Sequence, residues 1–283
     1  MQGRIIKLIS SSIMILGDDG FKYEARVSGK VKNKHRLVLG DLVVFHQEKD
    51  CYIVDELLAR KSYLIRPNVA NVDQALIVMS LKEPEFDEVL VNRLIIQIET
   101  ANIKPIILIT KCDLDDGGLK AIIDKYQAMG YSVYTNHQQA LNKQLLKLFK
   151  GKITVLAGQS GVGKTSLINQ FLPQFQLRTQ QISKSLNRGK HTTTHFEFFE
   201  LGGGMLADTP GFSSLEYYGD LKTLLDKLSL FKLSKDCCKY GDCKHINEPL
   251  CAVKDYISSH KECEVFYNCY KEIIIKKEKN QKW

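Results

Sequence analysis

The chain has 283 residues, a formal net charge of +8, 44% hydrophobic residues and 25% charged residues, which is typical of a globular protein of about two domains. No apolar run reaches the roughly 18 residues that a membrane span needs, and no secretory signal is visible, so we expect a cytoplasmic protein that does not enter a membrane. Eight cysteines in a reducing compartment favour metal ligation over disulfides, and the positive charge favours an anionic partner.

Short β-rich segments separated by turn signals make up the first 64 residues. The expected strands are residues 4–10, 12–17, 21–28, 36–46 and 51–58. The segments Gly17–Gly20 and Gly40–Asp41 are typical of turns between strands. Several short strands in succession predict a small closed or nearly closed barrel, and another small antiparallel domain is the alternative.

The pattern changes near Arg66-Pro67 to alternating strands and helices. Expected strands are residues 72–80, 103–110, 132–135 and 153–157, and expected helices are residues 88–101, 119–129 and 144–149. This alternation predicts a parallel sheet with helices on its faces.

The segment after the strand 153–157 fits the phosphate-binding pattern G-x-x-x-x-G-K-[ST], and a helix is expected to begin near Ser166. Glycines let the backbone turn tightly, so that its N–H groups point at phosphate oxygens. Lys164 would reach the β- and γ-phosphates, and the Thr165 hydroxyl would ligate Mg²⁺. A glycine-rich turn before a helix is the alternative. The candidate nucleotide-binding residues are Gly158, Gln159, Ser160, Gly161, Val162, Gly163, Lys164, Thr165 and Ser166.

The second candidate element is Thr110-Lys111-Cys112-Asp113, which follows a buried strand and is similar to the [N/T]-K-x-D element that selects guanine. Asp113 would accept hydrogen bonds from N1–H and the 2-amino group of guanine, which adenine does not offer. A charged surface turn is the alternative for such a short match.

Two further segments follow the phosphate loop along the chain. Asp208 and Gly211 belong to D-T-P-G, where an acidic side chain would hold Mg²⁺ and a glycine N–H would contact the γ-phosphate. Thr193 and Thr194 lie in a polar loop that would supply another Mg²⁺ ligand, or that is simply solvated. His191 is a candidate for orienting the attacking water, with a surface histidine as the alternative.

The order of these elements is unusual. In ordinary GTPases the phosphate loop comes first and the guanine-selecting element last, whereas here residues 110–113 precede residues 158–166. The reversed order predicts a circularly permuted GTPase domain. Such a permutation is tolerated because domain termini often lie close together.

Near the C-terminus, Cys238, Cys243, His245 and Cys251 offer three sulfurs and one imidazole. This set matches a tetrahedral structural Zn²⁺ site, and buried reduced cysteines are the alternative. Cys237 is adjacent, although the spacing favours Cys238. The remaining residues, Cys51, Cys112, Cys263 and Cys269, are interpreted as free thiols.

Together these pieces closely resemble the RsgA (YjeQ/YloQ) family of bacterial GTPases that depend on the small ribosomal subunit. The segments that carry the resemblance are TKCD at 110–113, GQSGVGKTS at 158–166, GKHTTTH at 189–195, DTPGF at 208–212 and CKYGDCKHINEPLCAV at 238–253. The resemblance implies an α/β protein with three parts, namely an N-terminal OB-fold RNA-binding barrel (1–64), a circularly permuted GTPase domain (65–216) and a zinc-binding helical module with a basic tail (217–283). Thr110, where the family usually has Asn, is a departure.

The resemblance also implies a function. The protein would bind the small ribosomal subunit and its rRNA as a monomer, assist late maturation of the subunit, and hydrolyse GTP to GDP with Mg²⁺ and one structural Zn²⁺ per chain. Turnover would be slow alone, because no Gln follows D-T-P-G, and it would be stimulated by the subunit. The alternatives are an RNA-binding assembly factor in which GTP acts mainly as a binding switch, and a phosphate-loop ATPase or kinase.

RNA contacts of the barrel are expected in its most basic run, which is Lys30, Lys32, Lys34, His35 and Arg36. OB-folds commonly bind oligonucleotides, which favours this interpretation. A solvated loop is the alternative on charge alone.

Overall fold

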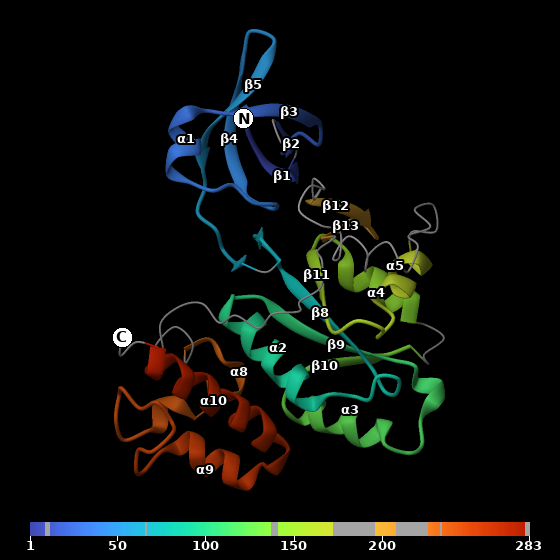
Figure 1. The fold of residues 1–283 in the computed structure, drawn as a ribbon, viewed down its shortest axis with the longest axis vertical. Coiled ribbons are helices and arrows are strands. Elements are labelled where there is room, and N and C mark those ends of the chain that lie inside the picture. Colours follow the sequence, from blue (N-terminus) through green and yellow to red (C-terminus); the bar gives the residue numbers. More distant parts are fainter. Residues whose placement is uncertain are drawn as a thin grey trace. The chain divides into compact units, whose positions relative to one another are not determined.

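The computed structural model describes residues 1–8, 12–65, 67–136, 141–171, 196–207, 226–232 and 234–280 (Figure 1). The described residues fall into two compact units. The first takes in Met1–Ala75, Asn142–Leu156 and the described residues from Lys164 to Ala207. The second takes in Leu76–Leu141, Ala157–Gly163 and the described C-terminal residues from Asp226 onward.

The first unit contains the predicted barrel, drawn in blue in Figure 1. Its elements are β1 (Gln2–Leu8), β2 (Ile13–Gly17), β3 (Lys22–Val27), α1 (Gly29–Lys34), β4 (Leu42–Glu48) and β5 (Cys51–Leu57). The strand order is β1-β2-β3-β5-β4, and an additional pairing of β1 with β4 closes the barrel. Closure leaves none of these five strands as a free edge, which confirms the closed form of the prediction.

Alternating side chains of these strands fill the barrel. Ile5, Ile15, Phe45 and Val54 have no exposed surface and form one apolar cluster with their neighbours. Residue Gly3 allows β1 to pass close to β2, because a Cβ there would lie 2.6 Å from Ile15 Cγ2. Because side chains alternate between the two faces of a strand, one side of each strand fills the barrel.

The helix α1 was not expected from the sequence. Its six residues, GKVKNK, fall within the basic run that was interpreted without a helix. Val31 is the one buried side chain of α1 and anchors it on the barrel core, while the lysines stay exposed.

The first unit continues with β6 (Tyr63–Leu64), β7 (Val69–Ala70), α4 (Leu141–Phe149), β11 (Ile153–Ala157), α5 (Lys164–Phe171), β12 (Phe196–Leu201) and β13 (Gly204–Ala207). Here the strand order is β11-β13-β12-β1. β11 and β13 are parallel, and β12 pairs antiparallel with β13. The hairpin of β12 and β13 was not predicted. It turns through Gly202 and Gly203, both at positive φ.

Buried polar contacts fasten β11 to the chain that enters β8 (Gln74–Ser80). The Gln74 side-chain amide donates to Thr154 Oγ1 and to the Leu148 carbonyl, each at 3.0 Å. The Ile153 N–H donates to the Asp73 carboxylate at 2.8 Å. These bonds position the strand that precedes the predicted phosphate loop.

The second unit contains the strand order β10-β9-β8. Its elements here are most of β8, then α2 (Glu88–Thr100), β9 (Lys104–Thr110), the 3-10 helix η1 (Cys112–Leu114), α3 (Leu119–Ala128) and β10 (Ser132–Thr135). β9 and β10 are parallel, and all seven residues of β8 are buried. The predicted strand–helix alternation is therefore confirmed for these residues.

The C-terminal part of the second unit is helical, with α8 (Ser229–Lys232), η3 (Lys235–Cys237), α9 (Ala252–Ser259), η4 (Lys261–Cys263) and α10 (Glu264–Asn280). α10 lies against α2, where the Arg93 guanidinium is 2.6 Å from the Glu272 carboxylate. None of the helices among the described residues is both long and apolar enough to cross a membrane.

Candidate nucleotide and metal sites

The predicted phosphate loop follows β11 and leads directly into α5. Three of its residues, Gly158, Gly161 and Gly163, have φ values of +130°, +84° and +93°. A Cβ at Gly158 would lie 2.1 Å from the Val78 carbonyl oxygen, so only glycine fits at this position. The loop thus has a tight backbone with no side chain at three of its six residues, as a phosphate cradle needs.

The predicted guanine-selecting loop is joined to the phosphate loop by Thr110. Its buried hydroxyl lies 2.6 Å from the Val162 carbonyl oxygen and 3.2 Å from that of Met79. A hydroxyl donates one hydrogen, so we assign it to the shorter contact with Val162. The residue that departs from the usual Asn therefore supplies a direct hydrogen bond between the two predicted nucleotide loops.

Asp113 lies exposed in η1, which begins after a backbone turn at Lys111. Lys111 has a φ of +53°, and its ammonium group donates to the Glu83 carbonyl. Cys112 is buried, with its thiol 3.3 Å from the Ile109 carbonyl. This loop therefore presents a carboxylate to solvent from a backbone that is fixed on both sides.

One residue of this site was missed in the sequence. The Cys112 N–H donates to Asn136 Oδ1 at 3.2 Å, and the Asn136 N–H donates to the Ile109 carbonyl at 3.0 Å. Asn136 follows β10, whose Thr135 is in register with Ile109 of β9. Because parallel strands end at the same edge of a sheet, a polar residue directly after the strand 132–135 was the signal that could have found it.

The predicted phosphate-binding lysine has an unusual environment. Lys164 begins α5, and Thr165 and Ser166 follow in its first turn. Burial lowers the pKa of Lys164 from 10.5 to about 8. A cation held in such a place gains most from an anionic ligand, which matches the predicted contact with phosphate.

Several predicted site residues lie outside the described residues. They are Gly211 and the catalytic candidate His191, together with the predicted Mg²⁺ ligands Thr193, Thr194 and Asp208. Their roles stay predictions.

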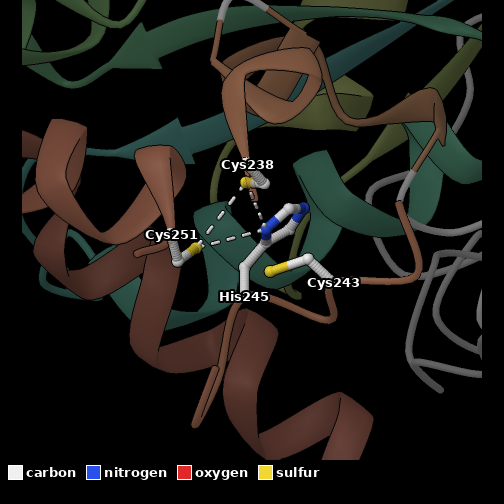
Figure 2. Close-up of side chains that lie close together, drawn as sticks. All are labelled: Cys238, Cys243, His245 and Cys251. Carbon is white, nitrogen blue, oxygen red and sulfur yellow. Dashed lines mark hydrogen bonds between the residues drawn. The ribbon is translucent and has the colours of Figure 1, made fainter. Parts of the chain in front are cut away.

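The four predicted metal ligands come together in the second unit (Figure 2). All four ligand atoms lie within 4.8 Å of one another. His245 Nδ1 is 3.5 Å from Cys238 Sγ and 3.4 Å from Cys251 Sγ, and the two sulfurs are 3.9 Å apart. A tetrahedron with Zn–S bonds of about 2.3 Å and a Zn–N bond of about 2.0 Å has edges of about 3.5–3.8 Å, so these residues fit a zinc ion.

Burial also shifts the protonation of these ligands. Burial raises the pKa of the Cys243 and Cys251 thiols and lowers the pKa of His245. Without a cation the thiols therefore hold their protons, whereas a divalent ion favours the thiolates. Among the described residues no other group of three or more His, Cys, Asp or Glu side chains forms such a cluster. Cys237 is exposed and is not one of the four.

Known proteins place this arrangement in a family. A family model described as RsgA GTPase matches residues 57–218. The small ribosomal subunit biogenesis GTPase RsgA of Bacillus cereus is 39% identical over 283 residues, covering 96% of each chain. The small ribosomal subunit biogenesis GTPase RsgA 2 of Oceanobacillus iheyensis is 41% identical, covering 95% of this chain and 94% of its own.

Two solved structures agree. The crystal structure of YloQ, a circularly permuted GTPase, superposes with a TM-score of 0.79 at 32% identity, covering 99% of this chain and 95% of that one. The crystal structure of YjeQ from Thermotoga maritima gives a TM-score of 0.79 at 26% identity and covers 97% of both chains. The match spans the barrel, both nucleotide loops in their reversed order and the Cys/His cluster, so the chain belongs to the RsgA GTPase family and has its circularly permuted GTPase fold.

Proposed function

We propose that this protein is a cytoplasmic, monomeric GTPase that binds the small ribosomal subunit, assists its maturation and turns over GTP faster when bound to it. Family membership and the names of the relatives support the GTPase activity and the role in small-subunit biogenesis. The single observation that supports the proposal most is the hydrogen bond from Thr110 to Val162, because it joins the predicted guanine-selecting loop to the predicted phosphate loop.

The described residues suggest how the nucleotide is held. Asp113 would accept from the guanine edge, the N–H groups of Gly158–Gly163 would surround the phosphates, and Lys164 would neutralise them. Thr165 would ligate Mg²⁺, together with Asp208 and with Thr193 or Thr194. The ion would compensate the negative charge that develops between the β- and γ-phosphates.

The residue that orients the attacking water is the least evident part of the predicted site. The sequence Phe212-Ser213 follows D-T-P-G where many GTPases have a Gln. We propose that His191 takes this role when the protein is bound to the subunit, so that turnover is slow in the free protein.

A basic hollow on the barrel supports contact with rRNA. It has a volume of about 610 Å³ and lies where α1 meets the ends of β2 and β3. Five of its lining residues carry basic side chains, namely Arg26, Lys32, Lys34, His35 and Arg36, and none is acidic. Lys30 is exposed on α1 and does not line the hollow. A concave surface with charge of one sign suits a phosphate backbone, and its affinity for RNA should fall steeply with salt.

The experiment that tests the proposal is phosphate release from GTP with and without purified small subunits, with ATP in parallel. We expect low turnover alone, a clear increase with subunits, and little activity with ATP. A Lys32→Ala/Lys34→Ala/Arg36→Ala variant should lose the stimulation while it keeps its basal rate. Subunit binding without any increase in phosphate release would support the binding-switch alternative and contradict stimulated hydrolysis.

Guanine selection has its own test. Asp113→Asn should shift preference from GTP towards the xanthine nucleotide. The 2-carbonyl of xanthine accepts a hydrogen bond, whereas the 2-amino group of guanine donates one. Competition among GTP, XTP and ATP measures the shift. An Asp113→Asn variant with unchanged preference for guanine would remove the base-site assignment.

A further inference from the structure

The metal loop, Cys243–Cys251, holds the predicted ligand His245 in a backbone conformation that residues other than glycine seldom adopt. His245 has a φ of +60° and is 3% exposed. Histidine adopts this left-handed conformation more often than most residues other than glycine, yet the conformation stays uncommon and persists where the surroundings fix it.

The carbonyl side of the loop is held from α10. The Tyr267 hydroxyl donates to the His245 carbonyl at 2.6 Å, and the Tyr270 hydroxyl donates to the Lys244 carbonyl at 2.6 Å. Tyr270 has no exposed surface and Tyr267 is 9% exposed. Two consecutive carbonyl groups around the predicted ligand are thus satisfied by buried phenols from a helix outside the ligand set.

The N–H side of the loop is held by Glu248. Its carboxylate accepts from the backbone N–H groups of Lys244, Ile246 and Asn247 at 2.9, 2.9 and 3.1 Å. These bonds fold the loop around the carboxylate. Because Glu248 belongs to the loop itself, it cannot fix the position of the loop on the rest of the unit.

The helix α10 is itself fixed on α2. The Arg93–Glu272 ion pair and a 3.8 Å contact from Cys269 Sγ to the Val89 carbonyl join the two helices. The Phe231 ring of α8 packs edge-on against Tyr270 and against the His245 imidazole, with ring centroids 4.8 and 5.7 Å apart. The tyrosines therefore project from a helix that contacts both α2 and α8, next to His245.

We propose that Tyr267 and Tyr270 are positioning residues of the metal site, and that α10 is by this means a functional part of it. Their hydroxyls hold the left-handed peptide that aims His245 Nδ1 at the three sulfurs. Partners of metal ligands commonly tune affinity in this way, and their loss weakens binding about 10–100-fold.

The test uses the full chain loaded with Zn²⁺ and a chromophoric chelator in competition. Tyr267→Phe and Tyr270→Phe each delete one hydroxyl and keep the ring. We expect the double variant to bind Zn²⁺ about 10–100-fold more weakly than the parent, and each single variant to fall between them. The control is Tyr256→Phe, a tyrosine of α9 whose ring stacks on His260 outside the metal loop, which should leave the affinity unchanged.

A merely structural role would give a different result. In that case the variants would melt at lower temperature, yet the chelator affinity, measured where each variant is folded, would stay within twofold of the parent. That outcome would overturn the proposal. If the double variant fails to fold, the single variants decide. Co²⁺-loaded protein gives a second readout, because its visible spectrum reports the tetrahedral ligand geometry and should change only in the tyrosine variants of α10. Neither the Zn²⁺ affinity nor the Co²⁺ spectrum depends on GTP turnover. A negative result here would therefore leave the proposed function untouched, and the reverse also holds.

Discussion

The phosphate loop Gly158–Gly163 and the metal loop Cys243–Cys251 both contain residues with positive φ angles. The first is predicted to bind a nucleotide, and the second a metal ion. The positive φ angles of the phosphate loop fall on glycines, and Gly158 is packed so closely that no Cβ fits. In the metal loop they fall on His245 and Leu250, at +60° and +53°, and side chains hold the backbone in place. The first loop should therefore be most sensitive to added atoms, and the second to removed ones.

Removal of the metal should have the largest effect. A structural zinc site contributes about 10–16 kcal/mol of folding free energy in small zinc peptides, and the loop around Cys243 and Cys251 has little apolar core of its own. Chelation should raise the amide hydrogen exchange of residues 238–251 at least about 100-fold, while β8 and β9 stay protected. The buried thiols should make metal loss easier at low pH. Restoration of slow exchange by Zn²⁺ is the control, and a chelated protein with unchanged exchange would exclude a structural metal.

The addition of one methyl group should have the next largest effect. In Gly158→Ala the new Cβ meets the Val78 carbonyl oxygen at 2.1 Å, at a φ of +130°. We expect GDP affinity to fall more than about 100-fold, because the loop must shift to relieve the clash and backbone strain alone costs about 1–3 kcal/mol.

Gly161→Ala is the matched control for this change. It has the same backbone handedness, but its Cβ would meet only Pro84 Cδ, at 3.8 Å. Fluorescent-GDP binding and thermal unfolding should show a much smaller loss. If the two alanine variants lose equal affinity, backbone strain rather than close packing shapes this loop.

Features that depend on neighbouring residues in the chain were predicted from the sequence. Short segments rich in apolar and β-branched residues were predicted correctly, such as β10 and β11, whose bounds agree with the structure. The four metal ligands were identified by residue type and spacing, and they do come together. The guanine-selecting motif was predicted from four consecutive residues alone, and its role stays a prediction.

What the sequence left unpredicted depends on contacts between distant residues. Tyr267 and Tyr270 lie more than 20 positions from the carbonyls that they contact, in a helix with no motif. Asn136 acts through a backbone N–H at Cys112, which no side-chain pattern reveals. α1 is only six residues long and owes its place to one buried Val31, so tertiary packing rather than helical periodicity sets it.

Lys164, the charged side chain at the start of α5, gives a smaller, pH-dependent effect. The pKa of Lys164 is lowered from 10.5 to about 8, so the free protein loses this charge as the pH rises through about 8. Phosphate binding needs the charge, and GDP affinity should fall about tenfold between pH 7 and pH 9. Because the pKa of Lys164 is lower in the folded state, that state holds fewer protons than the unfolded state between pH 8 and 10.5. The unfolding free energy of the protein without nucleotide therefore rises with pH over this range.

A Lys164→Arg variant separates this titration from that of the nucleotide. Arginine stays charged throughout the range, so any fall in affinity that persists in the variant belongs to GDP itself. Equal pH profiles for parent and variant would contradict a lowered pKa for Lys164. Titration calorimetry in buffers of different ionisation enthalpy should also detect more proton uptake on binding above pH 8 in the parent than in the variant.

Deletion of the Asn136 side chain should have the smallest effect. Asn136→Ala removes the acceptor of the Cys112 N–H beside Asp113, and one exposed hydrogen bond contributes about 1 kcal/mol, or about fivefold in GDP affinity. Asn136→Asp keeps an acceptor at the same place and should recover most of the loss at moderate salt, where repulsion from the exposed Asp113 is screened. The preference for GDP over ADP should fall in the alanine variant only, because the Asp113 carboxylate is then less well placed on the guanine edge. Equal losses in both variants would contradict this role, because Asp keeps both the shape and the acceptor oxygen of Asn. The amide N–H₂ group or the neutral charge of Asn136, rather than its bond to the Cys112 N–H, would then support the predicted base site.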